Sequence, residues 1–172
     1  MDADQGRAGI TTWAMSFNRR DRSTRRFGLP RLEAELSDSD VFSWIDIQAQ
    51  EIAPLNDVLK RLGIDVQLTS HFEAPEVLPR VADLPDCLAF TLYEVEDPER
   101  HLDTSHGLRE LDFVRLVVVL GLDFVLTFHR RDVDAVAYVR NACESSFRLW
   151  GKTPGFIAFL FLQRCLYDYA HL

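Results

Sequence analysis

Histidine and aspartate side chains lie close together in one polar segment of this chain, and these groups could bind a metal ion. His101 and His106 flank Asp103 within an acidic loop. Imidazole and carboxylate groups are common ligands of zinc and similar cations. A metal site needs three or four converging ligands, so a solvated loop without fixed geometry is the simpler interpretation. An enzyme site in this loop is the corresponding catalytic hypothesis, but no substrate suggests itself.

Another histidine, His71, lies on a short predicted helix near Glu73 and Glu76. Positions 71 and 73 point to different sides of a helix, which weakens the case for a shared site. His129 ends an apolar strand and precedes two arginines, and we interpret it as a strand-end polar residue.

The residues give no enzyme signature. The glycine-rich phosphate loops, the nucleophile elbow and the zinc-hydrolase helix motif are all missing from the sequence. The three cysteines, Cys87, Cys143 and Cys165, are far apart, which predicts buried free thiols in a reducing compartment. We therefore expect no catalysis in this chain.

Five arginines lie between positions 19 and 26 and could bind phosphates or anionic lipid. A solvated hairpin loop is the alternative, and it is the favoured one. The chain as a whole has a net charge of −8, which argues against a general nucleic-acid binder. An acidic chain is compatible with an intracellular protein that meets cations.

The length of 172 residues and the apolar fraction of 47% are typical of one globular domain. The N-terminal segment lacks the apolar core of a signal peptide. The longest apolar runs, at 116–128 and 156–162, are shorter than the roughly 20 residues that a membrane-spanning helix needs.

Alternating and helical hydrophobic periods predict the elements that position these side chains. Strands are expected around 13–17, over 41–47, and as two pairs joined by short turns, 77–84 with 87–95 and 116–120 with 124–129. An amphipathic helix is expected over 50–62, and a shorter one over 66–74. This mixed order predicts a mixed sheet with helices on both faces.

The C-terminal region is predicted to be helical. Asp132 is expected to cap one helix, and Thr153 and Pro154 are expected to begin another that is apolar nearly all round and therefore buried on most sides. Its helical pattern continues to Leu172 without a glycine, proline or polar residue that would end the helix, so we expect the native protein to continue past that residue.

Five stretches together resemble the cytoplasmic N-terminal domain of the CorA family of magnesium and divalent-cation transporters, which includes the ZntB-type zinc transporters. The similarity covers about three quarters of the chain in the family's order and spacing. The stretches are Ser43-Trp44-Ile45-Asp46-Ile47, Leu62-Gly63-Ile64, Leu78-Pro79-Arg80-Val81, residues 116–129, and residues 153–169 with Tyr167-Asp168-Tyr169.

The resemblance implies an α/β/α sandwich with a mixed parallel and antiparallel sheet. Residues 1–172 would be a single soluble domain at the cytoplasmic face of the inner or plasma membrane, and the stalk and transmembrane helices would lie outside this chain. The full-length protein would be a pentamer that transports divalent cations, and this domain would be its regulatory sensor.

One departure from the family concerns the regulatory cation site. The chain has Ser70-His71 where the family has Glu-Asp, so His71 becomes the candidate metal ligand. Imidazole suits Zn²⁺ better than Mg²⁺, which prefers oxygen ligands. The site has therefore either been lost, which is the more economical reading, or it binds a softer ion. The alternative function is a stand-alone interaction module with the same fold, using Phe156, Phe159 and Phe161 of an exposed final helix.

Overall fold

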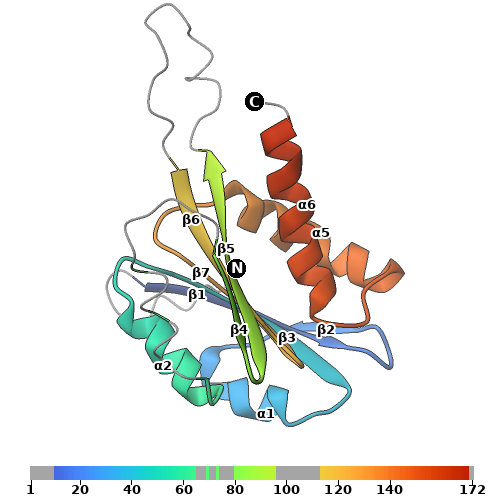
Figure 1. The fold of residues 1–172 in the computed structure, drawn as a ribbon. Helices are drawn as coiled ribbons and strands as arrows, with labels where there is room; N and C mark the ends of the chain where they lie inside the picture. The colour runs from blue at the N-terminus through green and yellow to red at the C-terminus, as the bar shows by residue number, and fades with distance from the viewer. Residues whose placement is uncertain (1–9, 65–68, 70–72, 74–79, 96–112, 171–172) are drawn as a thin grey trace, which may run out of the picture.

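The computed structural model describes residues 10–64, 69, 73, 80–95 and 113–170, which form one mixed sheet with helices on both of its faces (Figure 1). The strands are β1 (Ile10–Asn18), β2 (Thr24–Arg26), β3 (Val41–Ala49), β4 (Val81–Leu84), β5 (Cys87–Val95), β6 (Phe113–Gly121) and β7 (Phe124–His129). The helices are the short 3-10 turn η1 (Leu29–Arg31), α1 (Leu32–Leu36), α2 (Ala53–Arg61), α5 (Asp134–Leu149) and α6 (Gly155–Ala170).

The sheet has seven strands in the order β2-β1-β3-β7-β6-β5-β4. Every neighbouring pair is antiparallel except β3 and β7, which run parallel. The predicted turns at Pro85-Asp86 and at 121–123 are confirmed, since each joins two antiparallel neighbours. The sheet is thus two antiparallel groups of strands joined along one parallel seam.

Helices α1 and α2 cover one face of the sheet. Ile45 and Ile47 of β3 point to this side and pack with Leu55 and Leu59 of α2 in one buried cluster. The amphipathic pattern predicted over 50–62 corresponds to α2. The chain leaves α2 at Gly63, whose φ of 72° is a left-handed conformation that glycine adopts without strain.

Helices α5 and α6 cover the opposite face, and their core is aromatic. Trp44 of β3 points to this side because neighbouring strand residues alternate between faces. Its ring centroid lies 5.4 Å from that of Phe161, in edge-to-face contact. Phe17 and Phe42 stack in parallel with centroids 4.8 Å apart, and Phe147 of α5 packs edge-on against both.

Two expectations for the C-terminal helices were wrong in detail. Asp132 does not cap α5; the helix begins at Asp134, and the carboxylate of Asp132 accepts a hydrogen bond from Gln48 instead. Helix α6 buries one side only, because Phe161 is fully buried whereas Phe159 is 60% exposed. The three cysteines are free and buried, as predicted.

The helix expected over 66–74 lies mostly outside the described residues. Among the residues that the structure describes, none of the helices combines the length and the apolar character that a membrane crossing requires.

Candidate functional site

The side chains singled out as possible metal ligands, His71, His101, Asp103 and His106, lie outside the described residues. Within the described part of the chain, no group of three or more His, Cys, Asp or Glu residues is arranged to hold a metal ion. Two clusters of charged side chains lie on the α5–α6 face of the sheet.

The first cluster is centred on Asp46, in the middle of the apolar strand β3. Its side chain is fully buried. Trp13 of β1 and Thr127 of β7 lie directly beside it in the strand register, so the three residues form a row across the sheet. A carboxylate in this position is costly unless its oxygens accept hydrogen bonds from partners.

Those partners come from three elements. The Thr127 hydroxyl donates to Oδ1 of Asp46 and accepts a hydrogen bond of 3.0 Å from Nε1 of Trp44. Arg140 of α5 donates from Nη2 to Oδ2 of Asp46 at 2.5 Å. The guanidinium of Arg140 also lies over the ring of Trp13, 5.4 Å from its centroid. The network therefore fixes α5 to the β1, β3 and β7 strands at one point.

His129 completes this cluster. It ends β7, as predicted, but its side chain is buried, and both ring nitrogens face oxygen atoms. Nε2 lies 3.3 Å from Oδ2 of Asp46, and Nδ1 lies 2.6 Å from the carbonyl oxygen of Arg131. A neutral imidazole donates one hydrogen only, so the imidazolium form alone can donate to both. Burial by itself would lower the pKa of His129, but the hydrogen bond and charge of Asp46 and the Arg131 carbonyl raise it above its ordinary value.

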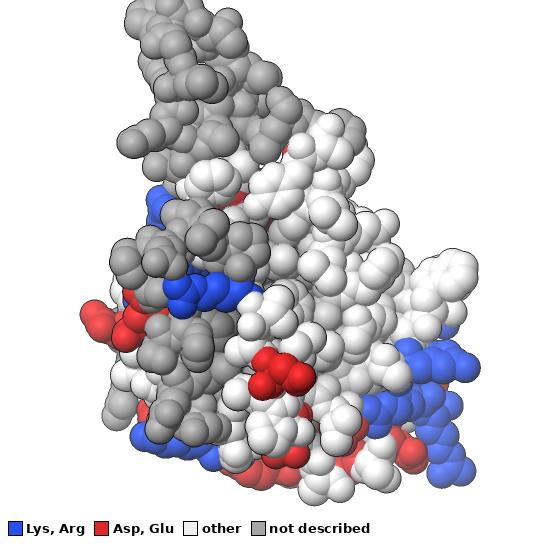
Figure 2. Space-filling model, in the orientation of Figure 1, with Lys and Arg blue, Asp and Glu red and all other residues white. Residues whose placement is uncertain are grey.

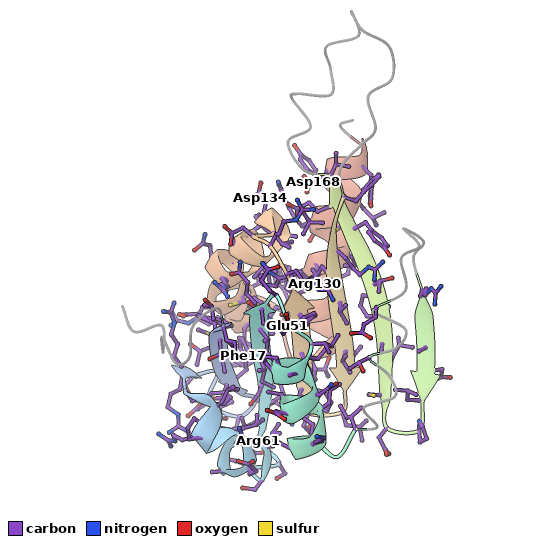
Figure 3. All side chains as sticks on the ribbon, turned by 90° about the vertical axis from the view of Figure 1, so that its left-hand side faces the viewer. Phe17, Glu51, Arg61, Arg130, Asp134 and Asp168 are labelled. Carbon is purple, nitrogen blue, oxygen red and sulfur yellow. The ribbon has the colours of Figure 1, made fainter. Side chains whose placement is uncertain are left out.

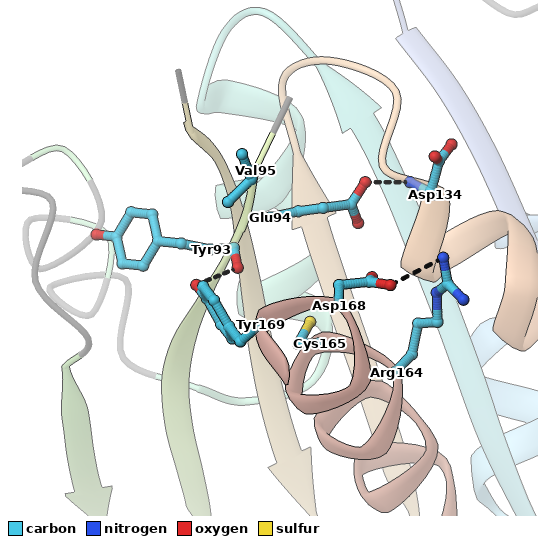
Figure 4. A pocket seen from close by; sticks show the side chains of 8 residues that line it. All are labelled: Tyr93, Glu94, Val95, Asp134, Arg164, Cys165, Asp168 and Tyr169. Carbon is cyan, nitrogen blue, oxygen red and sulfur yellow. Dashed lines mark hydrogen bonds and ion pairs between the residues drawn. The ribbon is translucent and has the colours of Figure 1, made fainter. Parts of the chain in front are cut away.

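The second cluster lines a small cavity of about 60 Å³ where β5 ends between α5 and α6 (Figure 4). Glu94, Asp134 and Asp168 contribute carboxylates, and Asp134 and Asp168 lie at the same end of the molecule (Figure 3). Arg164 pairs with Asp168 at 3.0 Å. The Tyr169 hydroxyl donates to the backbone carbonyl of Tyr93 at 2.5 Å.

Glu94 caps α5 from outside the helix. Its two carboxylate oxygens accept hydrogen bonds from the backbone N–H groups of Asp134 and Ala135, at 2.8 and 2.9 Å. These are among the N–H groups that a helix start leaves without partners. Burial raises the pKa of Glu94 despite these two hydrogen bonds, and the neighbouring Asp134 and Asp168 add to the increase. The cavity is thus a structural junction of β5, α5 and α6.

Most of the arginines at 19–26 stabilise the fold rather than forming a free basic loop. Arg19 forms an ion pair with Asp123 at 2.6 Å, and Arg25 pairs with the buried Glu35 at 2.5 Å. Arg22 donates to the carbonyl oxygens of Phe147 and Gly151. Figure 2 shows basic side chains gathered at the lower right, where the β1–β2 hairpin lies in Figure 1.

Sequence reasoning missed Asp46, Thr127, Arg140 and Glu94 as members of these clusters. Asp46 carried a usable signal, because it is the one charged residue within the apolar strand VFSWIDIQA. Buried charged residues require partners, so this position alone predicts a polar network. The partners could not be found from spacing, since Arg140 lies 94 residues away.

A family model described as "CorA-like Mg2+ transporter protein" matches residues 39–172. The chain belongs to this CorA-like family. The matched range contains strands β3 to β7 and helices α2, α5 and α6, whereas β1, β2 and α1 lie before it. No curated protein is similar enough to the chain to match it.

Three solved structures share the fold at low sequence identity. The full-length CmaX protein superposes with a TM-score of 0.70 at 17% identity, covering 98% of this chain and 49% of that one. The complete CorA magnesium transporter from Methanocaldococcus jannaschii superposes with a TM-score of 0.63 at 16% identity, covering 93% of this chain and 45% of that one. The ZntB cytoplasmic domain from Vibrio parahaemolyticus RIMD 2210633 superposes with a TM-score of 0.59 at 10% identity, covering 89% of this chain and 57% of that one. The chain therefore spans about half the length of these proteins.

The polar cluster lies within the stretches that carry the CorA-like resemblance. Asp46 is part of Ser43–Ile47, and Thr127 and His129 belong to the 116–129 stretch. These two stretches pair side by side in parallel along the β3–β7 seam. In this CorA-like chain the two motifs are thus one spatial unit.

Proposed function

We propose that this chain is the cytoplasmic N-terminal regulatory domain of a CorA-like divalent-cation transporter. The observation that carries the proposal is the family match over residues 39–172. Two facts support it: the α/β/α fold, and the chain's coverage of only 45% of the complete transporter from Methanocaldococcus jannaschii. The stalk and membrane helices then lie outside residues 1–172, which form a single domain.

In this role the domain makes and breaks no covalent bond. A cation that binds one conformation of the assembly more tightly than another shifts the population toward that conformation. The net charge of −8 favours the approach of cations. Carboxylates on neighbouring domains repel one another, and a cation bound between them relieves that repulsion.

The regulatory ion is proposed to be Mg²⁺ or a related cation such as Zn²⁺, with His71 as the candidate ligand. Calorimetric titration of the full-length protein with Mg²⁺ and then Zn²⁺ tests this, with His71→Ala as the variant and His171→Ala as its matched control. Zn²⁺ binding that is lost in His71→Ala and kept in His171→Ala makes the domain a sensor of soft metals. Mg²⁺ binding that is unchanged by His71→Ala removes His71 from the site.

Self-association, as a pentamer of the full-length protein, is part of the same proposal. An apolar strip along α6 supports a further contact, since Phe159 and Leu166 are 60% and 65% exposed. The molar mass of the full-length protein in detergent, measured by light scattering, tests the pentamer. A monomer would contradict it.

The alternative, a stand-alone interaction module, relies on the same strip on α6. The reading frame that follows codon 172 separates the two functions. A continuation with two apolar spans supports the transporter. A stop codon shortly after Leu172 supports the module and overturns the transporter.

A further inference from the structure

An open groove of about 590 Å³ runs between β2 and the second half of α5. Three arginines line it, Arg26 from β2 and Arg140 and Arg148 from α5. In a chain with a net charge of −8, three guanidinium groups in one groove are unexpected. One carboxylate, Glu144, lies among them.

Two of these arginines have no carboxylate partner in the part of the fold that the structure describes. Arg26 and Arg148 form no ion pair with any residue in the described part of the chain. Arg25, the neighbour of Arg26 on β2, pairs with Glu35, and Arg19 pairs with Asp123. The two free guanidinium groups are therefore available to a ligand.

The third arginine is held in place before any ligand arrives. Arg140 is anchored on the buried Asp46 through Nη2, while its Nε is buried and has no hydrogen-bond partner. Its guanidinium lies over the ring of Trp13, 5.4 Å from the centroid, and that of Arg26 lies over the same ring at 5.8 Å. The two guanidinium groups thus lie beside one indole ring and line the same groove.

We propose that this groove binds a phosphate-bearing anion, either the phosphate groups of a soluble nucleotide or the headgroup of an anionic phospholipid. Guanidinium groups match phosphate oxygens with two parallel hydrogen bonds, which makes arginine the preferred residue for this recognition. The volume is within the range of small-molecule sites. Leu149 lines the same groove and is 71% exposed, so it offers an apolar contact to the rest of the ligand.

Glu144 makes the proposal sharply testable. It lies one helical turn after Arg140 and one turn before Arg148, so its carboxylate faces the same groove and opposes an anion. Removing this charge is expected to strengthen binding, whereas removing an arginine is expected to weaken it. A variant that improves binding cannot be explained by damage to the fold.

The experiment is calorimetric titration of the 172-residue chain with inorganic pyrophosphate and with ADP, and co-sedimentation with phosphatidylcholine vesicles that contain or lack phosphatidic acid. Because each arginine supplies charge-assisted hydrogen bonds to phosphate oxygens, Arg26→Gln and Arg148→Gln should each weaken binding about tenfold or more. Glu144→Gln should tighten it. Arg20→Gln, which removes an exposed arginine outside the groove, is the matched control and should leave binding unchanged.

If the chain binds pyrophosphate and ADP but not the vesicles, the ligand is a soluble phosphate compound. If it binds only the vesicles that contain phosphatidic acid, the ligand is a lipid headgroup. The proposal is overturned if neither kind of probe binds, or if Arg20→Gln weakens binding as much as Arg148→Gln does. None of these outcomes bears on which cation the transporter moves, so the two proposals can fail separately.

Discussion

The Nε2 atom of His129 lies 3.3 Å from Oδ2 of Asp46, and this contact joins β7 to β3 beneath α5. The carbonyl of Arg131 holds the other ring nitrogen. The imidazolium therefore links the seam of the sheet to the segment that leads into α5.

This contact predicts that stability decreases as pH rises through the pKa of His129 in the folded chain. The pKa of His129 is raised above its ordinary value of 6.5 in the folded chain. The stabilisation is fully present below about pH 6.5 and is lost as pH rises through the folded pKa. Urea unfolding of the wild type from pH 6 upward, compared with His129→Gln, measures the effect. An equal pH dependence in the variant would show that His129 is not its source.

Replacing Asp46 by Asn is predicted to destabilise the chain by about 3 kcal/mol, because it leaves the Arg140 and His129 charges without their buried partner. Asp123→Asn breaks the more exposed pair with Arg19 and is expected to cost less than about 1 kcal/mol. Chemical denaturation of both variants gives the comparison. Similar losses of stability in the two variants would show that the Asp46 network contributes no more than the exposed pair.

Glu94 should respond differently to two substitutions. Because burial raises its pKa, the folded chain favours the protonated form, and stability should increase as pH falls toward that pKa. Glu94→Gln removes the charge and keeps one acceptor for the N–H groups of α5, so we expect little loss or a gain at pH 7. Glu94→Ala removes the cap and should cost about 1 kcal/mol. Thermal unfolding of the two variants measures both effects. A larger loss of stability in Glu94→Gln than in Glu94→Ala would contradict this prediction.

The two phenylalanines of α6 should differ strongly. Phe161→Ala empties a fully buried position against Trp44 and should cost about 3–5 kcal/mol. Phe159→Ala changes an exposed side chain and should alter the free energy of unfolding by less than about 0.5 kcal/mol. Denaturant titration of the pair tests which face of α6 belongs to the core.

The elements were predictable from the sequence because their signals are local. The hairpin of β6 and β7 follows from two apolar runs around Gly121, and α2 follows from leucines one turn apart. The partners of buried charges were not predictable. Glu94 caps a helix that begins 40 residues later, and Arg140 reaches a strand 94 residues earlier, so only the folded chain shows these pairs.

The same distinction separates the arginines at 19–26. Their clustering favoured a solvated hairpin loop over a phosphate-binding surface, yet Arg19 and Arg25 pair with carboxylates on other elements, and Arg22 donates to backbone carbonyls. Only Arg26 faces the open groove. The sequence does not show which of these arginines pair within the fold and which line the groove, because the course of β2 decides the side to which each side chain points.

The single parallel seam between β3 and β7 has a consequence for the order of folding. Every other strand pair joins strands that follow one another along the chain or, in the case of β1 and β3, are separated only by residues 19–40. The seam instead brings Asp46 beside Thr127, 81 positions later. Closing so long a loop costs the most chain entropy before any contact offsets it. The two antiparallel halves can form independently, and their union along the seam should limit the refolding rate. Thr127→Val should then slow refolding, measured by stopped flow, more than an equally destabilising change within the β4–β5 hairpin.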